Sequence, residues 1–181
     1  IETGQEKFIG RLDSLFIAES KIEGPLVSSD ISGLIGQYAH GNEPSHHIVH
    51  LYNYVNQSWK TQQLIDTILH TQYFNNPNGL SGNEDCGQMS AWYVLNAMGF
   101  YQVCPGSPIY SVGRPIFDKV TINLPNGKVF EIIANNNSRT NKYIQSIRLD
   151  NILLESPFFM HSDIMKGGKI VMEMGNTPVK Q

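Results

Sequence analysis

The chain has 181 residues, of which 40% are hydrophobic and 16% are charged, and its formal net charge is −3. This length suits one large domain or two small ones, and the net charge argues against nucleic acid or an anionic membrane as the main partner. No apolar run approaches the roughly 18 residues that a membrane span needs. The sequence begins at Ile1 rather than Met and shows no signal peptide, so we expect a processed start or a piece of a longer protein.

Apolar residues recur at helical spacing in the first part of the chain. Ser29-Asp30 and Ser58 are plausible N-terminal caps, Pro44 suits a first helical turn, and Gly99 suits a helix end. Several of these segments carry apolar residues on more than one face, which predicts packing against structure outside this chain. The expected helices are Phe8–Phe16, Ile31–Tyr38, Ile48–Val55, Ser58–Tyr73 and Gly87–Met98.

The pattern changes to strands after the breaker cluster Cys104–Pro108. Pro125-Asn126-Gly127 lies between two alternating runs and predicts a hairpin. Helices followed by strands indicate an α+β fold rather than βαβ units, with a helical segment at 1–105 and a β-strand region at 106–181. The expected strands are Tyr110–Gly113, Phe117–Leu124, Lys128–Ala134, Ile144–Leu149 and Lys169–Met174.

The chain has only two cysteines, Cys86 and Cys104. They are too few for a disulfide framework, and they are compatible with two buried thiols or with one disulfide. The redox compartment therefore stays open.

Asn83-Glu84-Asp85 places two carboxylates in a turn flanked by Gly82 and Gly87, just before an expected helix. One carboxylate at this position is commonly a helix cap, because its oxygen accepts an orphan backbone N–H. A catalytic base needs an ionised carboxylate, and a helix N-terminus favours the ionised form. The sequence leaves both interpretations open.

A second turn, Gly41–His47, repeats the order of polar turn, carboxylate and helix start around Glu43. Glu43 suits a first-turn acid, an acid catalyst, an acceptor for sugar hydroxyls or a metal ligand. Two carboxylate turns facing one cavity would suit acid–base hydrolysis of a glycosidic bond. The nearby His40, His46 and His47 raise the possibility of zinc, but their spacing does not match the helical two-His zinc pattern, and carboxylate plus Asn oxygens suit Ca²⁺ better.

Aromatic residues cluster around the last expected helix. Trp92, Tyr93, Phe100 and Tyr101 are compatible with a sugar-stacking platform, although aromatic residues at helical spacing are more often core.

Three long segments, Gly33–His47, Trp59–Gln62 and Gly82–Tyr93, closely resemble glycoside hydrolase family 92. The tail resembles it too, at Ile144–Ser146, His161–Met165 and Met174–Asn176. The resemblance implies a bacterial, secreted or periplasmic, calcium-dependent exo-α-mannosidase that inverts configuration, with α-1,2 linkages as the expected target. It also implies that this chain is only the last part of a longer protein. The expected fold is then the final helices of an (α/α)₆ barrel followed by an antiparallel, β-sandwich-like region.

The resemblance also implies roles for single residues. Asp85 matches the general base that activates water, and Asn83 matches a position that is often Asp and assists the base, so Asn is a departure here. Glu43, His46 and Glu84 are then candidate substrate-binding residues, and Asn42 and Glu43 are candidate calcium ligands.

The resemblance places the family's general acid outside this chain. It is a Glu in a Glu-Gly-Asn-x-Trp-Gln-Tyr motif, which is absent from this sequence and is expected upstream of Ile1. We therefore expect the isolated chain to be inactive, and its partners to be a mannose-containing glycan and the rest of the parent protein: an N-terminal β-sandwich and the first barrel helices. The alternative is a non-catalytic carbohydrate-binding or structural module.

Overall fold

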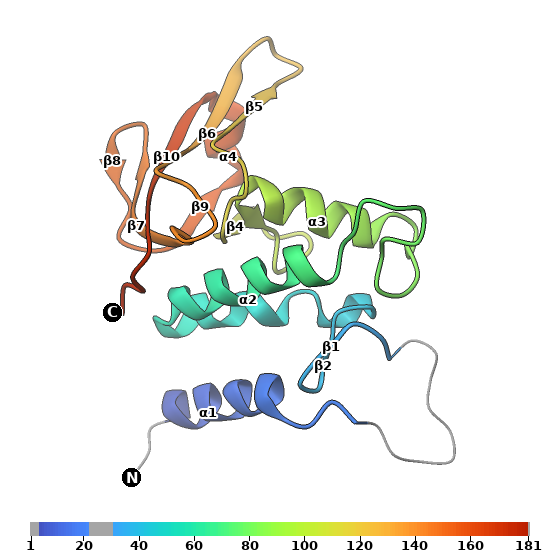
Figure 1. Cartoon of the computed structure of the whole chain (residues 1–181). Coiled ribbons are helices and arrows are strands. Elements are labelled where there is room, and N and C mark those ends of the chain that lie inside the picture. The colour runs from blue at the N-terminus through green and yellow to red at the C-terminus, as the bar shows by residue number, and fades with distance from the viewer. Residues whose placement is uncertain (1–3, 22–30, 181) are drawn as a thin grey trace.

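The computed structural model describes residues 4–21 and 31–180. In Figure 1 the helices of the first half of the chain lie in the lower and middle part of the view, and the strands of the second half gather at the upper left. Four of the five expected helical segments are confirmed, although 48–55 is a 3₁₀ helix rather than an α-helix. The helices are α1 (Gly4–Ile17), the 3₁₀ helices η1 (Glu43–Ser45) and η2 (Ile48–Val55), α2 (Ser58–Thr71), α3 (Gln88–Met98) and α4 (His161–Lys166).

The helix expected at Ile31–Tyr38 is wrong. The chain instead forms a short hairpin of β1 (Leu34–Ile35) and β2 (Tyr38–Ala39), while the predicted cap Ser29-Asp30 lies outside the described residues. The physical reason is Gly36, whose φ of 61° lies in the left-handed region and whose missing Cβ leaves room for the backbone of α1. The apolar residues at helical spacing therefore belong to a turn that packs on α1.

The remaining strands form two sheets. The order is β5-β6-β10-β7-β8 in a five-stranded sheet and β3-β4-β9 in a three-stranded sheet. All five expected strands are present, and β3, β8 and β9 are additional. The strands are β3 (Phe100–Tyr101), β4 (Ile109–Val112), β5 (Lys119–Asn123), β6 (Val129–Asn135), β7 (Tyr143–Leu149), β8 (Ile152–Leu153), β9 (Phe158–Met160) and β10 (Gly168–Gly175).

The expectation of a wholly antiparallel β region is also wrong. Strand β10 pairs with β6 in parallel, with Ile170 opposite Ile132, and pairs with β7 antiparallel on its other edge. The chain reaches this parallel register because it leaves β6, forms β7 to β9, and passes through α4 before β10 begins. A parallel pair requires such a long connection, which a hairpin pattern in the sequence does not reveal.

Buried apolar residues form two core clusters. One joins Tyr38 and Val49 to the inner faces of α2 and α3, where Ile65, Ile68 and Trp92 are fully buried. The other lies between residues of the two sheets, with Phe100, Val112 and Phe159 from one and Phe130, Ile132 and Ile170 from the other. Because β3 precedes residue 105 and pairs with β4, the three-stranded sheet draws on both predicted segments.

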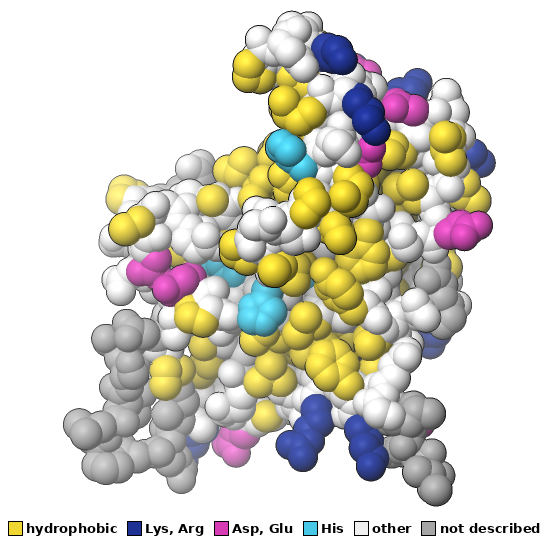
Figure 2. All heavy atoms as spheres, turned by 180° about the vertical axis from the view of Figure 1, so that it is seen from behind, with side chains coloured by type: hydrophobic (Ala, Val, Ile, Leu, Met, Phe, Trp, Pro, Cys, Tyr) yellow, Lys and Arg dark blue, Asp and Glu magenta, His cyan; other side chains and the backbone are white. Residues whose placement is uncertain are grey.

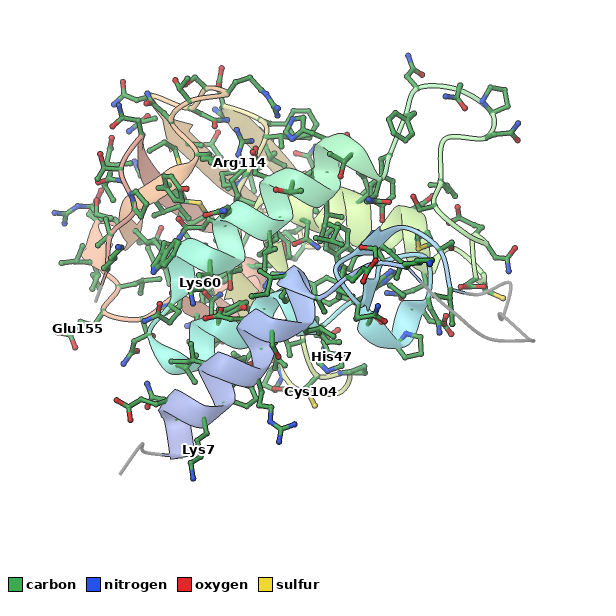
Figure 3. The ribbon with its side chains drawn as sticks, turned by 60° about the horizontal axis from the view of Figure 1, so that its bottom comes forward. Lys7, His47, Lys60, Cys104, Arg114 and Glu155 are labelled. Carbon is green, nitrogen blue, oxygen red and sulfur yellow. The ribbon has the colours of Figure 1, made fainter. Side chains whose placement is uncertain are left out.

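Two polar contacts fasten the helices to the β region. The side-chain oxygen of Gln62 on α2 accepts the backbone N–H of Ile144 on β7 at 2.9 Å, and Gln62 is buried. Nearby, the buried carboxylate of Asp66 lies 3.1 Å from the guanidinium of Arg114, which is 2% exposed. Figure 3 shows Arg114 on the sheet side of α2, and Lys60 on the side toward α1.

Cys86 and Cys104 are both free and both exposed. The expectation of two buried thiols is therefore wrong, because both thiols are exposed. The alternative, a disulfide between them, is not formed either. Figure 3 labels Cys104, which is exposed at the surface of the molecule.

The surface is partly apolar. Figure 2 shows hydrophobic side chains gathered over the middle of the face opposite to Figure 1. No helix within residues 4–21 and 31–180 combines the length and the apolar character that crossing a membrane demands.

Candidate active site

The two carboxylate turns of the sequence lie side by side. A Cβ placed on Gly82 would come within 2.5 Å of the carbonyl oxygen of Gly41, so the two backbones touch at these glycines. Gly82 also has a φ of 97°, which an L side chain rarely adopts. Glycine is therefore required where the two turns meet.

Asp85 is held in a left-handed turn at the start of α3. Its φ is 52°, and Cys86 and Gly87 follow with φ values of 56° and 95°. The carbonyl oxygen of Asp85 accepts the backbone N–H of Gln88 at 3.1 Å. Consecutive positive φ values are costly for residues with a Cβ, and such strain concentrates at functional sites. The turn therefore presents the half-buried Asp85 in a fixed position.

Glu84 acts as a cap of α3. Its side-chain oxygen accepts the backbone N–H of Ser90 at 3.1 Å, and its own carbonyl oxygen accepts the N–H of Met89 at 3.2 Å. This satisfies donors that a helix N-terminus leaves without intrahelical partners. The capping interpretation thus holds for Glu84. Asn83, just before it, is exposed.

Glu43 and Asn42 begin the neighbouring turn. Glu43 is exposed and opens η1 ahead of Pro44, while the half-buried Asn42 precedes it without making a side-chain cap. A carboxylate and an amide oxygen are hard donors that suit Ca²⁺. They are adjacent in sequence and lie on the turn that touches the Asp85 turn, so their chemistry fits a calcium site that other groups would have to complete.

His46 and His40 lie beneath these turns, stacked with ring centroids 4.8 Å apart. His46 Nε2 donates to the carbonyl oxygen of His40 at 3.0 Å, and His46 Nδ1 lies 3.0 Å from Gln88 Nε2. Burial lowers the pKa of His46, although the nearby Asp85 carboxylate acts in the opposite direction. His46 is therefore a neutral, buried neighbour of Asp85.

His40 is bonded to two tyrosines. The Tyr73 hydroxyl donates to the carbonyl oxygen of Met89 at 3.1 Å, so it accepts from His40 Nε2 at 2.7 Å, and the Tyr38 hydroxyl donates to His40 Nδ1 at 2.9 Å. Burial lowers the pKa of His40 to about 3. Both ring nitrogens of His40 are engaged by protein groups, as are those of His46.

The zinc alternative loses support from this arrangement. His47 is exposed, whereas His40 and His46 are buried. Within the described residues, no three His, Cys, Asp or Glu side chains come together as a metal-binding group.

A buried polar network next to the site was missed from the sequence. His50 bonds Asn96 on α3 at 2.9 Å and Ser111 on β4 at 3.1 Å, and Asn53 donates to Ser111 at 2.7 Å. Burial lowers the pKa of His50 to about 4. The available signal was the spacing of His50 and Asn53, one helical turn apart on the inner face of an otherwise apolar segment.

The four aromatic residues singled out in the sequence belong to the core or pack against it. Trp92 and Phe100 are buried, which confirms the core interpretation for both. Tyr93 and Tyr101 are half-buried, and the Tyr101 hydroxyl lies 3.0 Å from Gln88 Nε2. A separate cavity of about 470 Å³, lined by residues such as Phe74, Ser90 and Val94, includes neither Asp85 nor Glu43 in its walls.

Comparisons with known proteins show which family this chain resembles. The family model for the glycosyl hydrolase family 92 catalytic domain matches residues 2–176. A family GH92 α-mannosidase from Bacteroides thetaiotaomicron, solved in complex with mannoimidazole, is 43% identical with a TM-score of 0.91, over 97% of this chain and 23% of that one. A family GH92 inverting mannosidase from the same organism is 38% identical with a TM-score of 0.81, over 97% of this chain and 25% of that one.

A curated relative is also described as a glycosidase. An uncharacterised secreted glycosidase of Arthroderma benhamiae is 26% identical over 175 residues, which are 95% of this chain and 20% of that protein. This chain thus spans about a quarter or less of the length of these relatives. Since the family model matches almost all of it, and the strained Asp85 turn lies within the match, the chain belongs to glycosyl hydrolase family 92 and forms part of its catalytic domain.

Proposed function

We propose that this chain is the base-bearing part of an inverting, calcium-dependent exo-α-mannosidase that cleaves α-1,2-linked mannosides, with Asp85 as the general base. The observation that carries the proposal is the placement of Asp85. Its carboxylate stands on a rigid left-handed turn, beside a neutral His46 and against the turn of Glu43. We further propose that α1 to α3 belong to the last part of an (α/α)₆ barrel and that the rest of the parent protein completes it.

The chemistry asked of Asp85 is proton removal from water. The water oxygen forms a bond to the anomeric carbon as its proton passes to the Asp85 carboxylate, and the bond from that carbon to the leaving oxygen breaks on the opposite face. A separate acid, which we place outside this chain, gives its proton to the leaving oxygen. Inversion needs room for the water, so we expect the two carboxyl groups to be about 6.5–9.5 Å apart.

Asp85 is suited to this role because its surroundings favour a fixed, ionised carboxylate. The N-terminus of α3 follows it directly, and a helix N-terminus favours negative charge. The exposed Asn83 precedes it in the same turn and is proposed to assist by hydrogen bonding to the water. An amide cannot accept a proton there, so any second-carboxylate role of that position is lost in this chain.

The sugar is proposed to bind against the neighbouring turn. Glu43 and Glu84 are exposed and can accept hydrogen bonds from sugar hydroxyls. His46 is buried with both ring nitrogens bonded to the protein, so its support of substrate binding is proposed to be indirect. Asn42 and Glu43 would supply oxygen ligands to Ca²⁺, which when bound would hold and polarise sugar hydroxyls.

The isolated chain is proposed to be inactive, because the acid and most of the catalytic domain lie outside it. The secreted description of the Arthroderma benhamiae relative supports a proposed secreted or periplasmic location for the parent.

The product anomer tests this function. The full-length parent is incubated with α-1,2-mannobiose and the anomeric protons are followed by NMR from the first minutes. The proposal predicts that β-mannose appears first, and that a chelator of Ca²⁺ slows its release. If α-mannose appears first, the water-activating role of Asp85 is excluded, and if no mannose is released, the substrate assignment fails.

A further inference from the structure

Gln88 bonds three separate parts of the candidate site. Its backbone N–H donates to the carbonyl oxygen of Asp85 at 3.1 Å. Its side-chain Nε2 lies 3.0 Å from His46 Nδ1 and 3.0 Å from the hydroxyl oxygen of Tyr101 on β3. Gln88 thus contacts the turn of Asp85, the loop that carries His46, and β3 of the three-stranded sheet.

The orientation of the Gln88 amide follows from its partners. His46 Nε2 faces a carbonyl oxygen and must carry a hydrogen, so the neutral ring presents Nδ1 as an acceptor. The NH₂ group of Gln88 therefore points at His46 and donates its second hydrogen to Tyr101. The amide is thereby fixed at both hydrogens.

His46 connects Gln88 to the turn of Glu43. Its backbone N–H donates to the carbonyl oxygen of Glu43 at 3.0 Å, and its own carbonyl oxygen accepts from buried Trp92 at 3.0 Å. Gln88 is therefore bonded directly to the Asp85 turn and, through His46, to the Glu43 turn.

We propose that Gln88 is a positioning residue that sets the placement of Asp85 relative to the turn of Glu43. This inference rests on the proposed function, since it assumes that Asp85 is the base. A base displaced by about 1 Å loses much of its effect, up to about 100-fold in rate. Removing both side-chain bonds of Gln88 is expected to lower kcat by about 10- to 100-fold with little change in KM.

The test is a double-mutant cycle in the full-length parent. Gln88→Met keeps the length of the side chain and removes its donors. Asp85→Ala removes the base, and Gln63→Met on the exposed face of α2 is the matched control. If Gln88 acts through Asp85, then Gln88→Met lowers kcat in the wild type and lowers it no further in the Asp85→Ala background. Gln63→Met leaves kcat unchanged.

Three outcomes would overturn the inference. The first is that Gln88→Met keeps kcat within twofold of wild type. The second is that Gln88→Met lowers kcat equally in both backgrounds, which a purely structural role predicts. If Gln88→Met shows no cooperative thermal transition, Gln88→Asn replaces it in the same cycle, because its shorter amide cannot span both partners. If Asp85→Ala alone leaves turnover intact, the proposed function fails and the inference falls with it.

Discussion

The indole Nε1 of Trp92 donates a hydrogen bond to the carbonyl oxygen of His46 at 3.0 Å, and both residues are buried. This bond ties α3 to the loop that carries Glu43. The ring of Trp92 also lies 4.5 Å from that of His40, so the same side chain supports the buried histidine pair. The geometry of the candidate site thus depends on a residue that need not touch the substrate.

Trp92→Phe is expected to destabilise the chain by about 1–3 kcal/mol, because it leaves a buried carbonyl without its donor. Urea unfolding monitored by circular dichroism measures the change. The matched control is Trp59→Phe, since Trp59 is half-buried and donates only to nearby Gln57 at 3.2 Å. Equal losses in the two variants would show that the bond to His46 has no special weight.

Removing Asp66 from its buried ion pair with Arg114 is expected to cost more stability than removing Arg114. Asp66 also faces Lys142 at 3.6 Å and Arg139 at 3.7 Å, so Arg114→Met leaves the carboxylate with other cations. Asp66→Asn leaves the Arg114 guanidinium buried without its carboxylate, and losses of about 3–5 kcal/mol are typical of such a change. Asp66→Asn should therefore have the lower urea midpoint. The reverse order would contradict this account.

The cap made by Glu84 predicts a difference between two substitutions. Glu84→Ala should cost about 0.5–2 kcal/mol, because the N–H of Ser90 loses its acceptor at the start of α3. Glu84→Gln keeps an acceptor oxygen and loses only the charge, so its cost should be smaller. Thermal unfolding of both variants measures the difference, and equal midpoints would argue that the cap contributes nothing.

The buried histidines predict a loss of stability in acid. Burial lowers the pKa of His40 to about 3 and of His50 to about 4, while an unfolded histidine has a pKa of about 6.5. Below pH 6.5 the unfolded chain therefore binds more protons, and the free energy of unfolding falls until the pH reaches the folded pKa values.

Urea unfolding at intervals from pH 7 to pH 4 checks this prediction. Between its folded and unfolded pKa values, each histidine lowers the free energy of unfolding by up to ~1.4 kcal/mol per pH unit as the pH falls. His50→Gln removes one contribution, so its stability should depend less steeply on pH than that of the wild type. A wild-type stability that stays flat between pH 6.5 and pH 4 would contradict the neutral state of both rings.

Much of the fold follows from local patterns. The apolar spacing of α2 and α3 and the turn Pro125-Asn126-Gly127 determine elements that form from neighbouring residues, and these predictions are confirmed. The hairpin at Leu34–Ala39 was missed because its apolar residues also fit a helix, and only the close approach of Gly36 to α1 excludes that alternative. The parallel pairing of β6 with β10 depends on contacts between distant segments, which periodicity does not report.

The candidate site shows the same division. The sequence indicated that Glu43 and Asp85 belong to similar turns, and Gly41 and Gly82 allow those turns to touch. It could not tell which of the two acids caps α3, because only the bond from Ser90 assigns the capping role to Glu84. The side-chain bonds of Gln88 could not be predicted from the sequence, since they join residues that are far apart along the chain.

The turnover of one variant tests whether Asp85 is the general base. Asp85→Ala is made in the full-length parent, and Gln63→Met, on the exposed face of α2, serves as the control. With α-1,2-mannobiose as substrate, the account predicts that Asp85→Ala lowers kcat by about 100-fold or more while mannoside binding is retained, because only the proton acceptor is lost. Gln63→Met should keep the wild-type kcat. An Asp85→Ala enzyme that turns over at the wild-type rate would contradict the assignment of Asp85 as the base.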